Sequence, residues 1–301
     1  MRLLLVSAAV VAALALLPLG AGGYVLGLLT IGFYSGVFAM AWDLLFGFAG
    51  EVNFGPTFLV GLGAYGASLL NSLLGWPVPA CVAGGAALSV VGGVLLALPA
   101  LRLRGPYFGL VTLVAVLLLQ QAVTSFAHWT GGEIGLSLPD VLSIDDATNY
   151  WIALATMAVS GLLLFLYSRS PAGLILQACG QDPVEAAALG FNVSKHKLAA
   201  FCISAFFSGL AGAMLVFYFG TVSPGTVVDI TVGVQVIIAA VLGGRRTILG
   251  GAIGAVFLVV AGEVLRPLGQ LATFVVSAFA LVVILFVPDG LLGVLLHRRG
   301  T

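Results

Sequence analysis

The chain has 301 residues, of which 61% are hydrophobic and only 7% charged, and its formal net charge is zero. Soluble domains carry about a quarter charged residues, so this composition excludes a water-exposed globule and predicts an all-α, polytopic membrane protein. The zero net charge leaves no basic footprint for nucleic acid. The three cysteines and three histidines show no ligand spacing, so we expect neither a disulfide framework nor a metal site.

Apolar segments near the roughly 20 residues that a helix needs to cross a bilayer follow one another along residues 1–301. The first imitates a signal peptide, but the rest of the chain is equally apolar, so we expect this span to be retained. The eighth and ninth are short and flanked by glycine pairs, so they are either two crossings or a re-entrant hairpin. We therefore expect eight to ten spans in one transmembrane domain, with ten as the main expectation: Leu3–Leu19, Tyr24–Leu45, Phe54–Leu73, Val78–Leu101, Pro106–Ala127, Asn149–Ser168, Leu198–Phe219, Thr231–Leu242, Ile248–Leu265 and Gln270–Val287.

Basic residues fix the predicted orientation. The loops 128–148 and 220–230 contain acidic residues but no Lys or Arg, and Arg266 is the single basic residue that falls on their side. The positive-inside rule therefore places both termini and the loop 169–197 in the cytoplasm and the loop 128–148 outside. Ten of the eleven basic residues agree with this topology: Arg2, Arg102, Arg104, Arg169, Lys195, Lys197, Arg245, Arg246, Arg298 and Arg299.

The polar loop 169–197 contains a short predicted helix, Asp182 to Gly190. Asp182 is suited to cap its first free N–H groups, Pro183 fits the first helical position, and Gly190 can end it in a left-handed conformation. Such a helix at a membrane surface could dock a soluble partner, although an ordinary cytoplasmic loop would carry the same pattern.

A second unusual stretch, Gly47 to Pro56, packs three glycines, a proline and two polar side chains between apolar segments. It is either a connecting loop at the cytoplasmic surface or a broken helix that lines a pathway. We consider several uncharged polar residues as candidates for the pathway, with helix–helix hydrogen bonding as the alternative role: Asn53, Thr57, Gln120, Gln121, Thr124 and Gln235.

Several motifs argue against catalysis in this chain. Gly61-Leu62-Gly63-Ala64-Tyr65-Gly66 matches a dinucleotide-binding pattern, but it lies in an apolar span without the required acidic residue, so we expect helix packing instead. No nucleophile, paired acid–base or P-loop motif occurs, and any ATP chemistry would need another polypeptide. Asp43, Glu51 and Glu263 are the ionisable residues nearest the spans, and all lie near helix ends, which argues against an ion-driven carrier.

Four stretches, in order, resemble the permease subunits of branched-chain amino acid ABC importers, the LivH/LivM family, and its LivM type in particular. The last of them includes the segments Ala188-Leu189-Gly190, Val241-Leu242-Gly243-Gly244 and Pro288-Asp289-Gly290-Leu291. Glu51 and Pro56 depart from the family pattern, where Gln and His are frequent. The four stretches are residues 50–65, 101–113, 130–136 and 185–292.

The resemblance implies a multi-pass subunit of a bacterial-type cytoplasmic membrane, without a catalytic residue or cofactor of its own. It also implies a second, LivH-like permease subunit, two cytoplasmic ATP-binding subunits that hold ATP and Mg²⁺, an extracytoplasmic binding protein and contact with membrane lipid. The cargo would be a branched-chain or related amino acid. Family permeases dock an EAA-like helix on the ATPase, and the matching residues here are Asp182, Pro183, Glu185, Ala186, Ala187 and Gly190, although Gly190 follows Glu185 by five positions instead of six.

Two alternatives stay open at the level of sequence. One is an ion-coupled secondary transporter of a small solute, and the other is an ABC permease for urea or short amides. A non-transport membrane scaffold is a weaker third. The residues do not define the cargo, the residues that line the pore, or whether the permease is a homodimer or a heterodimer.

Overall fold

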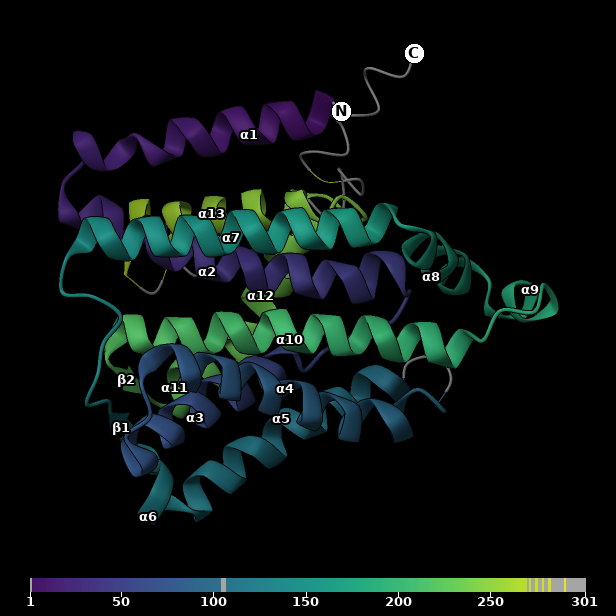
Figure 1. The fold of residues 1–301 in the computed structure, drawn as a ribbon, viewed down its shortest axis with the longest axis horizontal. Coiled ribbons are helices and arrows are strands. Elements are labelled where there is room, and N and C mark those ends of the chain that lie inside the picture. The colour runs from purple at the N-terminus through teal and green to yellow at the C-terminus, as the bar shows by residue number, and fades with distance from the viewer. Residues whose placement is uncertain are drawn as a thin grey trace.

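The computed structural model describes residues 2–103 and 107–269, together with the isolated positions 271, 274, 275, 278, 281, 282 and 290. The described chain is a bundle of long, roughly aligned helices (Figure 1). The long helices are α1 Arg2–Ala15, α2 Gly23–Asp43, α3 Pro56–Leu74, α4 Val78–Ala100, α5 Tyr107–Ser125, α7 Asp146–Arg169, α10 Val193–Phe219, α12 Ile230–Gly243 and α13 Leu249–Val264. The short elements are η1 Leu17–Leu19, the π-helix η2 Leu44–Phe48, α6 Ala127–Thr130, β1 Leu136–Ser137, α8 Pro171–Gln181, α9 Pro183–Ala188, β2 Thr221–Val222, α11 Pro224–Val227 and η3 Arg266–Leu268.

These helices confirm an all-helical, multi-pass membrane protein, apart from one two-residue strand pair. Within the described residues, seven helices are long and apolar enough to cross a bilayer, with α11 and α12 counted together and α13 among the shorter apolar helices. The predicted segments from the first to the ninth each coincide with a helix, shifted by a few residues at most ends. The tenth, Gln270–Val287, lies outside the described continuous residues, as do Arg104, Arg298 and Arg299.

The centre of the bundle is packed through glycines on α3, α4 and α10. A Cβ at Gly63 would lie 2.3 Å from the carbonyl oxygen of Gly209, and one at Gly85 would lie 2.4 Å from that of Gly63. A Cβ at Gly212 would lie 2.3 Å from the carbonyl oxygen of Val60. The pattern Gly61 to Gly66 therefore serves helix packing, as predicted, because only residues without a side chain let three backbones approach this closely.

Helix α13 lies along α2 from one end to the other. Near one end, the backbone N–H of Ile248 donates to Asp43, and at the other Tyr24 donates to Glu263. Between these ends a Cβ at Gly36 would lie 3.2 Å from the Cα atom of Ala252. Tyr24 and Asp43 are about 28 Å apart along a helix at 1.5 Å per residue. The eighth and ninth segments are thus two helices, α12 and α13, and α13 reaches the far end of α2, as two crossings would require. Whether the pair crosses the membrane twice stays a prediction.

The bundle has two different ends (Figure 1). The ladder end carries β1 and β2, which pair antiparallel with Leu136 opposite Val222, so the two loops predicted to share a side do lie together. The α9 end carries α8, α9 and the loop between α12 and α13. Basic residues collect at the α9 end: Arg102, Arg169, Lys195, Lys197 and Arg246 contact or line sites there, whereas Arg266 pairs with Glu263 at the ladder end.

Helix α1 is attached at the edge of the bundle. Its contacts with α7 include hydrogen bonds from Tyr150 to the carbonyl oxygen of Leu14, at 2.8 Å, and from Trp151 to that of Ala15, at 3.2 Å. Figure 1 shows it lying across the outer side of α7 and α13.

Candidate functional site

The candidate coupling helix forms where the sequence predicts it. Asp182 accepts hydrogen bonds from the backbone N–H groups of Val184 and Glu185, at 2.8 and 3.0 Å, and Pro183 is the first residue of α9. Gly190 has a φ of +91° and its N–H donates to the carbonyl oxygen of Ala187 at 2.9 Å. The helix therefore has both caps, with the left-handed residue after its end, as the local sequence requires.

Most of α9 is exposed, and it projects from the bundle (Figure 1). Val184 and Leu189 are 78% and 75% exposed, and Glu185, Ala187 and Gly190 are exposed with them. Ala186 is the exception, because it is 2% exposed. Two large apolar side chains held in solvent on a capped helix are what a docking surface for another protein presents.

A single extended residue joins α9 to α8. Asp182 is both the C-terminal cap of α8 and the N-terminal cap of α9, with φ −139° and ψ 100°. The side chain of Asp182 fixes the start of α9, and no other residue separates the two helices. The local sequence pattern does not mark α8 as a separate helix.

Helix α8 packs directly against the glycine-rich segment that follows α2. A Cβ at Gly180 would lie 2.3 Å from the carbonyl oxygen of Phe48 and 2.8 Å from the carbonyl carbon of Ala49. In turn a Cβ at Gly50, whose φ is +70°, would lie 2.6 Å from the carbonyl oxygen of Gly180. The polar loop 169–197 and the segment Gly47 to Pro56, which lie far apart in the sequence, are therefore in backbone contact.

An ion pair joins the same segment to α10. Lys197 Nζ lies 2.6 Å from Glu51 Oε1, and the two side chains are 12% and 20% exposed. Glu51 is a candidate for ion coupling by its place in the sequence, and in the structure its carboxylate is paired with a lysine of the same chain. Glu263 likewise bonds to Tyr24 and Arg266.

The segment from Gly47 to Pro56 is a connecting loop at the α9 end, and it penetrates the bundle. The main-chain oxygen of Asn53 accepts a hydrogen bond from Trp42 Nε1 at 2.7 Å, and the N–H of Phe54 donates to Thr112 at 3.1 Å. A Cβ at Gly55 would lie 1.8 Å from the carbonyl oxygen of Thr112, so only glycine fits there. The five-residue π-helix η2 includes the first two residues of this segment, Gly47 and Phe48, and such turns recur at functional sites.

The candidate pathway residues fall into different places. Asn53 and Thr57 are both buried, at 2% and 1% exposed, and within the described chain the Thr57 hydroxyl has no hydrogen-bond partner. Gln120 and Gln121 lie on α5, half-buried and exposed respectively, and Gln235 is exposed on α12. Thr57 lies next to Gly233 of α12, because a Cβ added at Gly233 would lie 3.4 Å from the methyl group of Thr57. The fold thus brings Asn53 and Thr57 close to each other in the chain's interior but leaves Gln121 and Gln235 on its surface.

Asp43 holds the loop between α12 and α13. Its buried carboxylate accepts from the backbone N–H groups of Arg246 and Ile248, at 3.1 and 2.9 Å. Arg246 and Ile248 have φ values of +63° and +54°, a conformation that costs a β-branched residue such as Ile energy. The carboxylate offsets that cost by satisfying two N–H groups, a role that sequence position alone did not predict.

The sequence of the chain matches a known protein family. The profile of the family described as branched-chain amino acid transport system permease component matches residues 24–288. The chain belongs to this family. The matched region runs from the first turn of α2 past α13, so it includes the glycine-rich segment, α8 and α9, while α1 precedes it.

Named relatives cover most of the chain. It is 26% identical over 285 residues to the high-affinity branched-chain amino acid transport system permease protein LivM of Salmonella typhimurium, an alignment that covers 85% of this chain and 67% of the relative. It is 25% identical over 289 residues to LivH of Escherichia coli K12, an alignment that covers 88% of this chain and 92% of LivH. It is also 25% identical over 289 residues to BraD of Pseudomonas aeruginosa, with 88% of this chain and 93% of BraD covered. No solved structure matches the chain. The relatives are permease proteins by name, in agreement with the resemblance expected from the sequence.

Proposed function

We propose that the chain is a permease subunit of an ABC importer in a bacterial cytoplasmic membrane, with a branched-chain or related amino acid as cargo. Membership of the permease family supports the class of transporter, and the names of LivM, LivH and BraD support the class of cargo. In this proposal the chain pairs with a second, LivH-like permease and receives its cargo from an extracytoplasmic binding protein. ATP and Mg²⁺ belong to two ATP-binding subunits that dock at the α9 end.

The observation that carries the proposal is the capped, exposed helix α9 joined to a glycine-rich segment inside the bundle. A partner that grips Val184 and Leu189 would move α9, and α9 is one residue from α8. Because Gly180 and Gly50 leave no space between their backbones, displacement of α8 would be passed to the segment that contains Asn53. ATP-driven closure of the partner would thus alter access at the interior end of this segment.

The test compares Gly190→Pro with Gly75→Pro. Both glycines have positive φ, +91° and +62°, which proline cannot adopt. Both donate a backbone hydrogen bond that proline would remove, and a Cβ at either would meet nothing within 4 Å. Gly75 follows α3 and lies away from α9, so the pair matches the local damage and differs in position.

We expect an ATPase to co-purify from the native host with the wild-type chain and with Gly75→Pro, and to be lost with Gly190→Pro. Uptake of a labelled branched-chain amino acid should fail in the same variant. Absence of an ATPase from the wild type, under conditions that preserve membrane complexes, would contradict the proposal and favour an ion-driven carrier.

The ion-driven alternative makes an opposite prediction. Glu51→Gln should abolish dependence of uptake on an ion gradient if the chain is such a carrier. In the importer proposal the same change disturbs the pair with Lys197 but leaves ATP as the energy source.

A further inference from the structure

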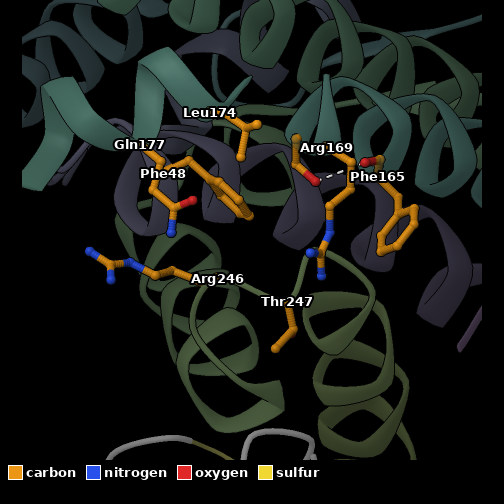
Figure 2. Close-up of a pocket in the computed structure, with 8 residues that line it drawn as sticks. Phe48, Phe165, Arg169, Leu174, Gln177, Arg246 and Thr247 are labelled. Atoms are coloured by element: carbon orange, nitrogen blue, oxygen red, sulfur yellow. Dashed lines mark hydrogen bonds between the residues drawn. The ribbon is translucent and has the colours of Figure 1, made fainter. Parts of the chain in front are cut away.

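A cavity of about 120 Å³ opens at the α9 end between α7, α8 and the loop that joins α12 to α13. Phe48, Phe165 and Leu174 provide apolar walls, and Ser168, Arg169, Gln177, Arg246 and Thr247 provide the polar lining. Figure 2 shows Arg169 and Arg246 on opposite sides of this space, with the Arg246 side chain extending away from Arg169, Gln177 above Arg246 and Thr247 below Arg169. Among the residues that the structure describes, none that lines the cavity is acidic.

The two arginines have unused hydrogen-bonding capacity. Arg246 donates from Nε to the carbonyl oxygen of Gly47 at 2.8 Å, which fixes its stem and leaves its terminal nitrogens free of described partners. Arg169 lies over the ring of Phe165, 5.5 Å from its centroid. Among the described residues, the ion pairs involve other side chains, and Asp43 bonds to the backbone of Arg246 instead of its guanidinium.

The two hydroxyl groups of the cavity lining already donate their protons to main-chain oxygens. Ser168 donates its hydroxyl proton to the carbonyl oxygen of Phe165, and Thr247 donates to that of Gly244. Among the described lining residues, the donors without a described acceptor are therefore the Arg169 guanidinium, the terminal nitrogens of Arg246 and the amide of Gln177. A guanidinium group binds the oxygens of a phosphate group in a bidentate manner, and two arginines in the lining give this cavity a positive charge that favours an anion.

The position of the cavity agrees with this chemistry. Arg169 is the last residue of α7, and Arg246 comes three residues after α12 ends at Gly243, so both lie where candidate spans leave the membrane. Basic pockets between helices at this level bind the headgroups of anionic lipids. The apolar walls would lie beside the glycerol and the first acyl carbons of such a lipid.

We propose that this cavity is a binding site for a phosphate group, carried either by an anionic phospholipid or by a free phosphate anion. Its ligand would bridge α7, α8 and the α12–α13 loop. Because α8 also contacts Phe48 to Gly50, an occupied site would restrain the same element that the proposed coupling motion displaces.

The test uses the full-length chain in neutral detergent and native mass spectrometry. The probes are dioctanoyl phosphatidylglycerol, dioctanoyl phosphatidylcholine and inorganic phosphate. The variant is Arg169→Gln with Arg246→Gln. Its matched control is Arg102→Gln with Lys195→Gln, which removes the same charge from the same end but from a different cavity. Arg169→Gln alone is a second variant, since this side chain makes no hydrogen bond within the described residues and its loss should leave the fold intact.

We expect phosphatidylglycerol to bind the wild type more tightly than phosphatidylcholine. Each arginine should contribute roughly fivefold to the affinity, so the cavity pair should weaken binding by about 25-fold. The control pair should change it by less than about threefold. Equal binding of inorganic phosphate, with the same dependence on the arginines, would identify a free anion as the source of the phosphate group.

Three outcomes would overturn the proposal. Equal losses from both pairs would indicate general attraction to a basic surface, and no binding of any probe would remove the site. Loss of a co-purifying ATPase from the cavity pair, with lipid binding unchanged, would assign the arginines to a protein contact.

Discussion

Gly180→Ala tests whether the contact between α8 and the glycine-rich segment constrains the protein. The added Cβ would lie 2.3 Å from the carbonyl oxygen of Phe48, whereas ordinary contacts begin near 3.4 Å, so α8 must move by about 1 Å. The three nearest atoms all belong to backbone, which leaves no flexible side chain to yield. Overpacking of this kind costs about 1–3 kcal/mol.

Helix propensity acts in the opposite direction. Replacing glycine by alanine inside a helix stabilises it by roughly 1 kcal/mol when nothing else changes. The sign of the effect therefore distinguishes the two cases. We expect Gly180→Ala to lower the unfolding temperature of the purified chain and to reduce amino-acid uptake by about tenfold, on the scale of 1.4 kcal/mol per factor of ten.

Co-purification of the ATPase should persist in this variant, because α9 itself is unchanged. Gln181→Ala, at the exposed neighbouring position, is the control and should leave uptake near the wild-type level. A raised unfolding temperature with normal uptake would refute the reasoning, since it would mean that the backbone contact carries neither strain nor motion.

Further predictions concern the cap, the ion pair and pH. Asp182→Ala should cost about 1 kcal/mol of local stability by removing the N-terminal cap, and it should weaken ATPase co-purification more than Asp182→Asn does. In a double-mutant cycle with Glu51→Gln and Lys197→Met, a partly buried pair should show a coupling free energy of roughly 1 kcal/mol by thermal unfolding, and additive effects would rule out a direct interaction. The Thr148 side chain and its backbone N–H hold the pKa of the Asp145 carboxyl below its usual value of 3.8. This cap therefore stabilises the protein above that pH and is lost as the pH falls through the folded pKa, so Thr148→Val should flatten the acid side of a plot of unfolding temperature against pH, and an unchanged plot would contradict the assignment.

Local patterns in the sequence were sufficient to predict several features. Apolar length predicted the helices, and Asp182, Pro183 and Gly190 predicted α9, because caps depend on residues a few positions apart. The segment Gly47 to Pro56 was recognised as unusual for the same reason, since its composition is incompatible with a continuous helix.

Long-range partners could not be predicted in this way. The pairing of Gly50 with Gly180, of Glu51 with Lys197 and of Asp43 with the α12–α13 loop depends on tertiary packing. A charge near a helix end has the same local signature whether it binds an ion, forms a pair or caps a loop. The roles of Asn53, Thr57, Gln120, Gln121 and Gln235 in a pathway remain predictions, because they depend on surfaces that a second subunit would complete.

The strand pair described at the ladder end has a mechanical consequence. Leu138 and Leu142 donate backbone hydrogen bonds to the carbonyl oxygens of Gly220 and Phe217, and Asn71 bonds to Asp140. Segments from three distant parts of the chain are thus hydrogen-bonded together at that end. At the other end most of α9 is exposed, and short connections join it to α8 and α10. We therefore expect the ladder end to stay fixed when a partner displaces α9.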